Sequence, residues 1–421
     1  MNDAPPPPLP DPAELSHWLI REGLAGATVP ALLGGLAARL TDQGMLLLRV
    51  SLGSPTLHPI WRGHLNVWRR ATGLAPQDAF SHVGAADTAD SGQAGNPFVW
   101  MLMNDKRHLR LDPIKDDHPF DIVRRLGHEE GATDYAAWSV PLGNQGGRSV
   151  WESWRSGQAG AMSISFATDR PGGFRDAEIG LLDSLLPTLA LGVRAAVAST
   201  VATSALETYL GPDAAQRVLS GEIIRGTTDT IDAAICYADL SGFTAVSDTL
   251  SAEDLVTTIN AYMDCMALPF TSRGGEVLKF TGDGMLASFQ LADRDHADVC
   301  RTALDAVEDA QDRVLALNAK RMERGQDIMG LDMALHLGEV RYGNVGAADR
   351  LDFTVIGPTV NEASRIEALS GTLDYPVLIS ETFARAALHC GARLSEIGRV
   401  RLRGVRTPRL LFTLKRYRDT A

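Results

Sequence analysis

The sequence predicts an α+β protein made of two domains joined by a long helix. A chain of 421 residues is longer than one hydrophobic core ordinarily organises. All seven tryptophans lie between Trp18 and Trp154, which indicates two cores of different composition. Between the tryptophan-rich first part and the tryptophan-free remainder, apolar residues recur at helical spacing over residues 174–210. Strand-like runs occur on both sides of this segment, so each domain is expected to contain a sheet.

The connecting helix over residues 174–210 carries few helix-breaking residues. Only Gly180, Pro187 and Gly192 interrupt it, and a kink is expected at the proline. The small residues between 195 and 205 would allow another helix to approach closely. Two interpretations stay open: a terminal helix packed on its own domain, or a seam between two copies of the chain.

Composition excludes several classes of partner. A net charge of −12 leaves no basic stripe to neutralise nucleic-acid phosphates. No uninterrupted apolar run approaches the ~20 residues that span a bilayer. The first residues, "MNDAPPPPLPDP", are acidic and proline-rich, unlike a secretory signal. We therefore expect a cytoplasmic protein with no membrane span and no nucleic-acid partner, whose residues 1–12 form a disordered arm.

The cysteines and histidines form no recognisable metal site. The cysteines lack CxxC or Cys/His ligand spacing and are expected to be buried thiols in a reducing cytoplasm. The histidines of the first half share no ligand spacing either, and are expected to be ordinary surface or core residues. These residues are Cys236, Cys265, Cys300 and Cys390, and His58, His64, His108 and His118.

The first domain shows three strand-like runs: "VWMLMN" (99–104), "AAWSVPLG" (136–143) and "GAMSISFAT" (160–168). The run "SISFATDRPGGFRDAEIGLLDSLLPTLA" resembles the end of a GAF-type sensor domain, where a last strand leads into a long helix. "WSVPL" fits the preceding strand of that family. A PAS-like or other sensor fold is the alternative.

Two aspartates of the second domain stand at the ends of predicted strands. Asp239 ends an apolar run and precedes a Ser-Gly turn into a helix, where the N–H groups of residues 240–244 can hold anionic oxygens. Asp283 lies in "FTGDGMLASF" (280–289), an Asp-Gly hairpin signal. Each alone is most simply a capping or turn residue. Placed together in one sheet, two carboxylates and substrate phosphates would make a Mg²⁺ site.

A third motif, "ALHLGEVRYGNVGAADRLDFTVIGPTVNEASRIEALS" (334–370), completes a resemblance. Together with "YADLSGFT" and "LKFTGDGMLASF", it resembles the catalytic domain of class III nucleotidyl cyclases, in order from about Ile231 to Phe412. The resemblance implies a ferredoxin-like α+β fold and a site formed between two catalytic domains of a homodimer.

The resemblance assigns roles to particular residues. Metal binding, with two Mg²⁺ or Mn²⁺ ions per site, falls on Asp239, Leu240 and Asp283. The residues that stabilise the transition state fall on Asn361 and Arg365, four apart on one helix face. Substrate contacts fall on Lys279, Thr354, Arg403, Phe243 and Thr244, and Arg350 is a further candidate for the phosphates.

The two base-reading positions imply ATP as the substrate. Lys279 with Thr354 resembles the bacterial and soluble subgroup of adenylate cyclases, some of which respond to bicarbonate. Guanylate cyclases carry Glu and Cys at these positions. One departure concerns Arg403, which stands in "RLRGVRTPRLLF" where the family usually offers a phosphate-binding lysine. An arginine can bind phosphate in a bidentate fork, so function is expected to survive.

The sequence thus predicts a regulated adenylate cyclase that forms cyclic AMP and pyrophosphate. A degenerate cyclase fold that senses nucleotide without turnover is the alternative from another class. The partners implied are ATP, a second copy of the chain, and an unidentified signal at the first domain, with bicarbonate a further candidate. The predicted parts are a disordered arm (1–12), a GAF-like sensor domain (13–195), a connecting helix or transducer (196–228) and a cyclase catalytic domain (229–421).

Overall fold

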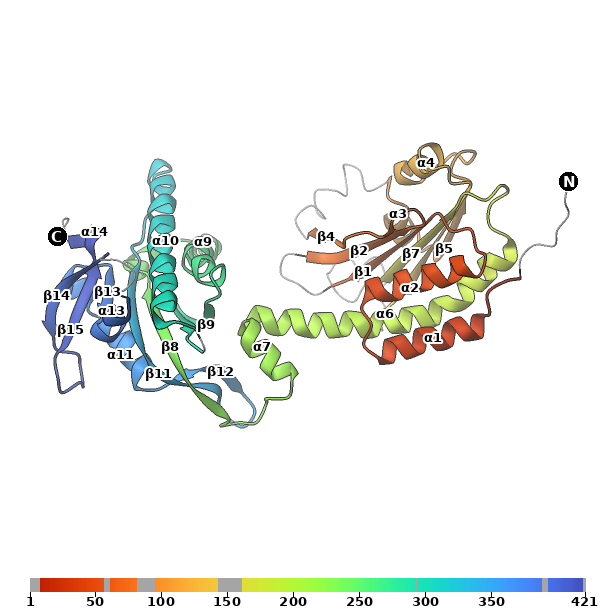
Figure 1. Cartoon of the computed structure of the whole chain (residues 1–421). Coiled ribbons are helices and arrows are strands. Elements are labelled where there is room, and N and C mark those ends of the chain that lie inside the picture. The colour runs from red at the N-terminus through yellow and green to blue at the C-terminus, as the bar shows by residue number, and fades with distance from the viewer. Residues whose placement is uncertain are drawn as a thin grey trace. The chain divides into compact units, whose positions relative to one another are not determined.

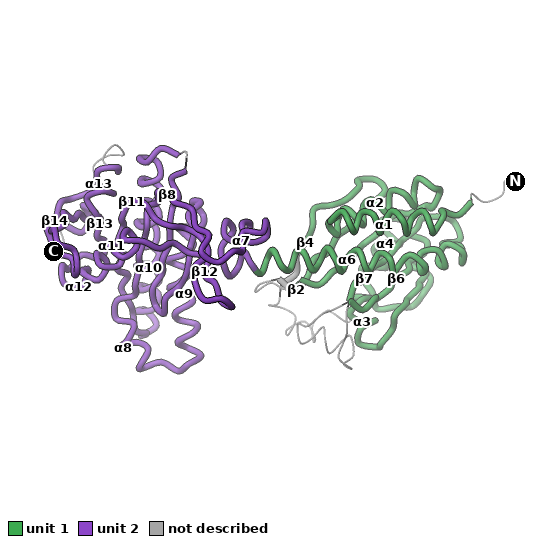
Figure 2. Tube along the Cα trace, turned by 90° about the horizontal axis from the view of Figure 1, so that it is seen from below, with its two compact units in different colours: residues 1–205 green, residues 206–421 purple. Residues whose placement is uncertain are grey.

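The computed structural model describes residues 8–56, 61–81, 95–142, 161–292, 294–387 and 393–418. The chain divides into two compact units, Met1–Ala205 and Leu206–Ala421 (Figure 2). His58, Cys390 and most of the proline-rich arm lie outside the described residues. The domain boundaries expected from the sequence stay a prediction.

The first unit is built on an antiparallel sheet (Figure 1). Its strands follow the order β3-β2-β1-β7-β6-β5, and β4 pairs with β2. The neighbouring strands β1 and β7 place Leu52 opposite Ile164. The elements of this unit are α1 (Pro12–Leu24), α2 (Val29–Asp42), β1 (Arg49–Pro55), β2 (Trp61–Arg69), β3 (Gly73–Leu74), β4 (Asp78–Ser81), α3 (Pro97–Met103), β5 (His108–Leu111), α4 (Asp121–His128), β6 (Asp134–Pro141), β7 (Ala161–Thr168) and α6 (Asp176–Leu210).

Two hydrophobic clusters cover the two faces of this sheet. Leu52, Ile164 and Trp138 face α1, α2 and α6 in the larger cluster. Tyr135 and Ala137, on alternate residues of β6, face α3 and α4 in the smaller one. This alternation follows from the period of two residues along a strand. The mixed α/β architecture expected for this unit is present, and its GAF-like assignment stays a prediction.

One predicted strand of the first unit is wrong. "VWMLMN" forms helix α3 and its C-cap, not a strand. The Asn96 side chain accepts hydrogen bonds from the N–H groups of Phe98 and Val99, and Pro97 occupies the first helical turn. Both features favour a helix start, and they outweigh the strand propensity of the apolar run.

Helix α6 confirms the predicted long helix and contains Pro187 in its interior. Its apolar residues Leu182, Leu185, Leu189 and Val193 are buried in the larger cluster. In length and composition α6 also meets the requirements of a membrane-spanning helix, and 39% of its most apolar window is buried inside the structure. A packed helix of a globular unit has these same properties.

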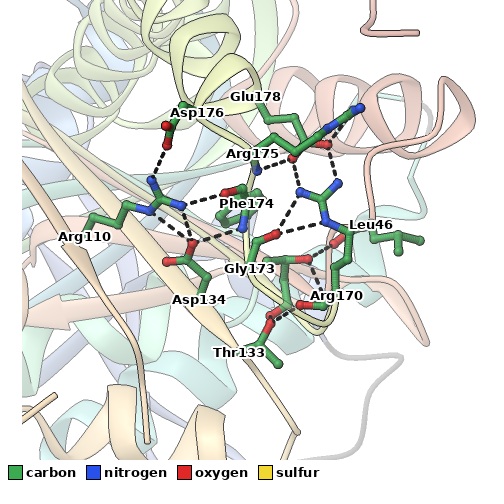
Figure 3. A network of polar contacts seen from close by, with 11 residues as sticks. Leu46, Arg110, Thr133, Asp134, Arg170, Gly173, Phe174, Arg175, Asp176 and Glu178 are labelled. Carbon is green, nitrogen blue, oxygen red and sulfur yellow. Dashed lines mark hydrogen bonds and ion pairs between the residues drawn. The ribbon is translucent and has the colours of Figure 1, made fainter. Parts of the chain in front are cut away.

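A polar network fixes the start of α6 (Figure 3). The carboxylate of Glu178, which is 1% exposed, is bound by the guanidinium groups of Arg170 and Arg175. Arg110 donates to Asp134 and to the carbonyl oxygen of Phe174. Asp134 also accepts from the N–H of Phe174, so the network joins the loop before α6 to strands β5 and β6.

The second unit contains an eight-stranded sheet with the order β14-β15-β13-β11-β8-β10-β9, and β12 pairs with β11. Its pairs are antiparallel except β11 with β13. Its elements are α7 (Pro212–Leu219), β8 (Thr228–Asp239), α8 (Phe243–Ser247), α9 (Ala252–Thr271), β9 (Glu276–Thr281), β10 (Gly284–Gln290), α10 (His296–Glu323), β11 (Asp332–Gly346), β12 (Leu351–Ile356), α11 (Pro358–Glu367), α12 (Ser370–Leu373), β13 (Val377–Ser380), α13 (Glu381–Ala387), β14 (Leu394–Val400), β15 (Arg409–Leu414) and α14 (Lys415–Arg418).

Successive residues of β8 serve opposite faces of this sheet. Ala234 and Cys236 pack towards α9, α10 and α13. Ala233 and Ile235 pack towards α7 and α11, together with residues of β11 and β12. The expected burial of thiols holds for Cys236 and Cys300, while Cys265 is half-buried. Because both faces are covered, β8 is apolar along its second half and places its terminal carboxylate at the edge of the core.

Candidate active site

Asp239 and Asp283 lie close together at one end of the sheet. Asp239 is the last residue of β8, and Asp283 lies in the two-residue turn between β9 and β10. Strand β10 pairs with β8, and Met285 lies opposite Ala238. In this turn Gly282 adopts the positive φ (71°), so Asp283 does not have to adopt a left-handed conformation.

The glycine after Asp283 makes room for the carboxylate of Asp239. A Cβ on Gly284 would lie 2.9 Å from the Asp239 Oδ1 and 2.8 Å from the carbonyl oxygen of Ala238. Burial, and then the charge of Asp283, raise the pKa of Asp239. A cation between the two carboxylates would remove this repulsion, so the pair fits a divalent metal ion with few protein ligands.

Two further acids, which the sequence analysis missed, belong to the same neighbourhood. Asp332 is the cross-strand neighbour of Asp239, and burial followed by the charge of Asp239 raises its pKa to about 6. Burial and the nearby charges of Asp239, Asp332 and Asp283 raise the pKa of Glu367 to about 7. The register between β8 and β11 brings Asp332 here, and no spacing in the sequence reveals that register.

No metal-binding group of three or more His, Cys, Asp or Glu side chains occurs within the described ranges. The candidate ligands are therefore the two aspartates, with Leu240 beside them. The Leu240 side chain is buried, and its carbonyl oxygen accepts from the N–H of Phe243. Two carboxylates, completed by substrate phosphates and water, are a common ligand set for Mg²⁺.

Helix α8 follows this turn and carries two of the expected substrate contacts. Its N-cap, Gly242, has a positive φ of 86°. Phe243 is half-buried against the larger core of the unit, and Thr244 is exposed. The first four N–H groups of a helix have no partner within the helix, and α8 has only five residues. Its N–H groups are therefore what this segment offers to an anion.

Lys279 and Thr354 line one cavity of about 990 Å³. Lys279 lies on β9, with its side chain exposed, and Arg350 lines the same cavity. Thr354 lies on β12 and is 4% exposed, and its hydroxyl has no hydrogen-bond partner among the described residues. An unpaired buried hydroxyl is costly, which makes Thr354 a candidate for a bond to a ligand.

Asn361 and Arg365 are exposed on successive turns of α11. The turn that contains Arg403 lies beside Arg365, because a Cβ on Gly404 would lie 3.8 Å from the Arg365 guanidinium carbon. The structure therefore brings Arg365 next to the 403–404 turn, although Arg403 lies 38 positions after Arg365 in the sequence. The cavity lining contains neither Asp239 nor Asp283.

Residues 227–416 match the family described as the adenylate and guanylate cyclase catalytic domain. This part of the chain is a class III cyclase domain.

Curated relatives of the cyclase domain include two bacterial adenylate cyclases. The chain is 30% identical to an adenylate cyclase from Anabaena cylindrica over 164 residues, which are 38% of this chain and 32% of the relative. It is 33% identical to adenylate cyclase 1 of Rhizobium meliloti (strain 1021) over 147 residues, 34% of this chain and 22% of the relative. The chain thus spans a third or less of the length of these relatives.

Among solved structures, the adenylyl cyclase CyaB from P. aeruginosa is 25% identical, with a TM-score of 0.42. The match covers 45% of this chain and 95% of that one. The guanylyl cyclase Cya2 is 29% identical, with a TM-score of 0.39, covering 44% and 93% of the two chains.

Proposed function

We propose that this chain is an adenylate cyclase, which converts ATP into 3′,5′-cyclic AMP and pyrophosphate. The observation that carries the choice of ATP is the cavity lined by both Lys279 and Thr354, with its unpaired threonine hydroxyl. Both relatives described above are named adenylate cyclases.

The base would be read by hydrogen bonds. Lys279 has only donors, which suit the N1 acceptor of adenine. The Thr354 hydroxyl can donate or accept, so it suits the amino edge of the base. Guanine presents the opposite pattern at these atoms, and a lysine facing its N1–H would meet a donor with a donor. Discrimination against GTP follows from leaving those polar groups unpaired.

Asp239 and Asp283, with Leu240, would hold two Mg²⁺ or Mn²⁺ ions per site. Bound there, such ions would lower the pKa of the ribose 3′-hydroxyl and neutralise charge on the triphosphate. In the reaction, the 3′-oxygen forms a bond to the α-phosphorus, and the bond to the leaving pyrophosphate breaks.

The remaining residues would act on the ribose and the phosphates. Arg365 would stabilise the charge that develops on the α-phosphoryl group, and Asn361 would orient the ribose. Arg403, beside Arg365, would bind the phosphates with its planar fork, with Arg350 as a further candidate. Backbone N–H groups around Phe243 and Thr244 would hold the triphosphate.

Two copies of the chain would share each site, one supplying the aspartates and the other Lys279, Asn361 and Arg365. We place this homodimer in the cytoplasm, and assign to residues 13–195 a GAF-like sensor that biases it through α6. The sensor's signal is unidentified, and bicarbonate is a candidate modulator of the cyclase domain.

The test is turnover by the purified full-length protein with ATP or GTP, each with Mg²⁺ or Mn²⁺. Formation of cyclic AMP from ATP that exceeds formation of cyclic GMP from GTP supports the proposal. Preferred formation of cyclic GMP would make the protein a guanylate cyclase. Binding of ATP with no product under any of these conditions would make it a nucleotide sensor instead.

A further inference from the structure

The cavity that contains Lys279 and Thr354 is also lined by the segment through which the chain enters the second unit. Residues 207–213, from the end of α6 to the start of α7, form part of its wall. Glu276, the first residue of β9, lines the cavity as well. It stands three residues before Lys279 on the same strand, and it is 7% exposed.

The carboxylate of Glu276 binds the N-terminus of α7. Gly211, the N-cap of this helix, has no side chain to cap it. Instead, the Glu276 Oε1 accepts from the N–H of Ala214 at 3.4 Å. A carboxylate at a helix N-terminus is stabilising, because it meets unpaired N–H groups and the positive end of the helix dipole.

Gly211 is fitted to this contact in two ways. Its φ of 87° lies in the left-handed region, which favours glycine. A Cβ at this position would lie 2.8 Å from the Glu276 Oε1. The approach of α7 to β9 therefore depends on the glycine and the carboxylate together.

The second oxygen of Glu276 binds the sheet on the other side. The Tyr342 hydroxyl of β11 donates to the Oε2 at 2.8 Å, and both side chains are buried. The Tyr342 ring packs edge-on against Phe353, with ring centroids 4.9 Å apart. Phe353 directly precedes Thr354, so this contact reaches the strand of the second base-reading residue. Glu276 thus connects α7 with β9, which carries Lys279, and with β11, which pairs with the strand β12 that carries Thr354.

We propose that Glu276 is a positioning residue, which sets the spacing of Lys279 and Thr354 according to the position of the 211–214 segment. This inference rests on the proposed function of these two residues. Because α7 follows α6 directly, a displacement at the end of α6 would alter base recognition by a route confined to the second unit. The effect would be a change in nucleotide affinity and preference, with little change in the rate of the chemical step.

The experiment measures KM and kcat for ATP and GTP with full-length Glu276→Gln and Tyr342→Phe. The glutamine still accepts from Tyr342 but loses the charge that faces α7. We expect KM for ATP to rise about 5–10-fold with kcat within about 2-fold, the pattern of lost uniform binding, and ATP preference over GTP to fall in parallel. Tyr342→Phe should act in the same direction, and the double variant should be less than additive because the two side chains form one network.

The matched control is Glu323→Gln, an exposed glutamate in the last turn of α10, which should match wild type. Unchanged KM and unchanged nucleotide preference in both single variants would overturn the inference. If Glu276→Gln fails to fold, Tyr342→Phe decides alone, since it removes only one hydroxyl. A wild-type protein that makes no cyclic AMP would refute the proposed function instead, whereas an active wild type with unaltered variants refutes this inference only.

Discussion

At the scale of single residues, the proposed turnover of ATP depends on Asp239 and Asp283, the two aspartates near the ends of strands. Their proximity depends on pairing between β8 and β10 and on the absence of a side chain at Gly284. Neither requirement is visible in either motif alone. The proximity of the two aspartates is the expectation that the structure meets, and their role as metal ligands stays a prediction.

Asp239→Asn or Asp283→Asn should abolish nearly all Mg²⁺- or Mn²⁺-dependent turnover and leave the protein folded. The amide keeps the size of the side chain but removes the charge that a cation needs. Product formation and the thermal melting temperature are the measurements. Asp232→Asn is the control, since Asp232 is an exposed residue of the same strand. Full activity in either Asp239→Asn or Asp283→Asn would contradict the assignment of these residues as metal ligands.

Base choice is the second prediction at this scale. The double variant Lys279→Glu with Thr354→Cys should lose most of its ATP turnover and gain turnover of GTP. The carboxylate accepts from the guanine N1–H, where the lysine offered only donors. Steady-state rates with both nucleotides test this, and retention of the wild-type rate and preference would contradict the account of base reading.

At the scale of elements, the long helix and the hairpin were predictable, and the register was not. The predicted helix over 174–210 is α6, and the hairpin predicted from the Asp-Gly signal forms between β9 and β10, with Gly282 and Asp283 in its turn. The apolar run of α3 predicts a strand, and the Asn96–Pro97 helix start outweighs that propensity. Asp332 reaches Asp239 only through the pairing of β8 with β11. Contacts of this kind depend on the three-dimensional structure and leave no local pattern.

The start of α6 yields a prediction about stability. Burial alone would raise the pKa of Glu178, but its hydrogen bonds to Arg170 and Arg175 outweigh burial and lower it. A lowered pKa stabilises the folded state above the ordinary value of 4.5, and this stabilisation disappears as the pH falls through the folded-state pKa. Glu178→Gln should therefore cost about 2 kcal/mol at pH 7, and less in acid.

Urea unfolding of the full-length protein at pH 7 and at pH 3 measures this difference in free energy of unfolding. The exposed Glu14→Gln variant in α1 is the control. An equal loss at both pH values would show that Glu178 stabilises the helix start by packing and not by its charge.

At the scale of the whole molecule, the proposed homodimer predicts complementation between two inactive chains. Asp239→Asn would remove metal binding from both sites, and Arg365→Ala would cost about 3–4 kcal/mol of transition-state stabilisation in both. A mixed dimer would hold one doubly damaged site and one intact site. With random pairing about half of the dimers are mixed, so activity should recover to roughly a quarter of wild type.

The two variants can be coexpressed under separate tags and the mixed dimer isolated by two affinity steps. Cyclic AMP formation by this isolated species is the measurement, and about half of the wild-type rate is expected because one of its two sites is intact. A mixed dimer as inactive as its parents would show that the site is not divided between chains in the proposed way.

Regulation by the first unit gives the last prediction. A chain that begins near residue 200 should still cyclise ATP, with an altered rate or dimer affinity, because the proposed sensor and most of α6 are gone. Activity measured over a range of protein concentrations separates the two effects. Kinetics identical to those of the full chain at every concentration would argue against regulation by the first unit.

The fit between Gly211 and the carboxylate of Glu276 has a consequence for building chimeras. The first unit can be exchanged for a foreign domain only if the junction leaves Gly211 with the cyclase domain. A fusion joined a few residues downstream would place another residue at position 211. The Cβ of that residue would clash with the Glu276 carboxylate and displace α7. Fusions with junctions on either side of residue 211 would then differ sharply in their basal output, even with linkers of equal length.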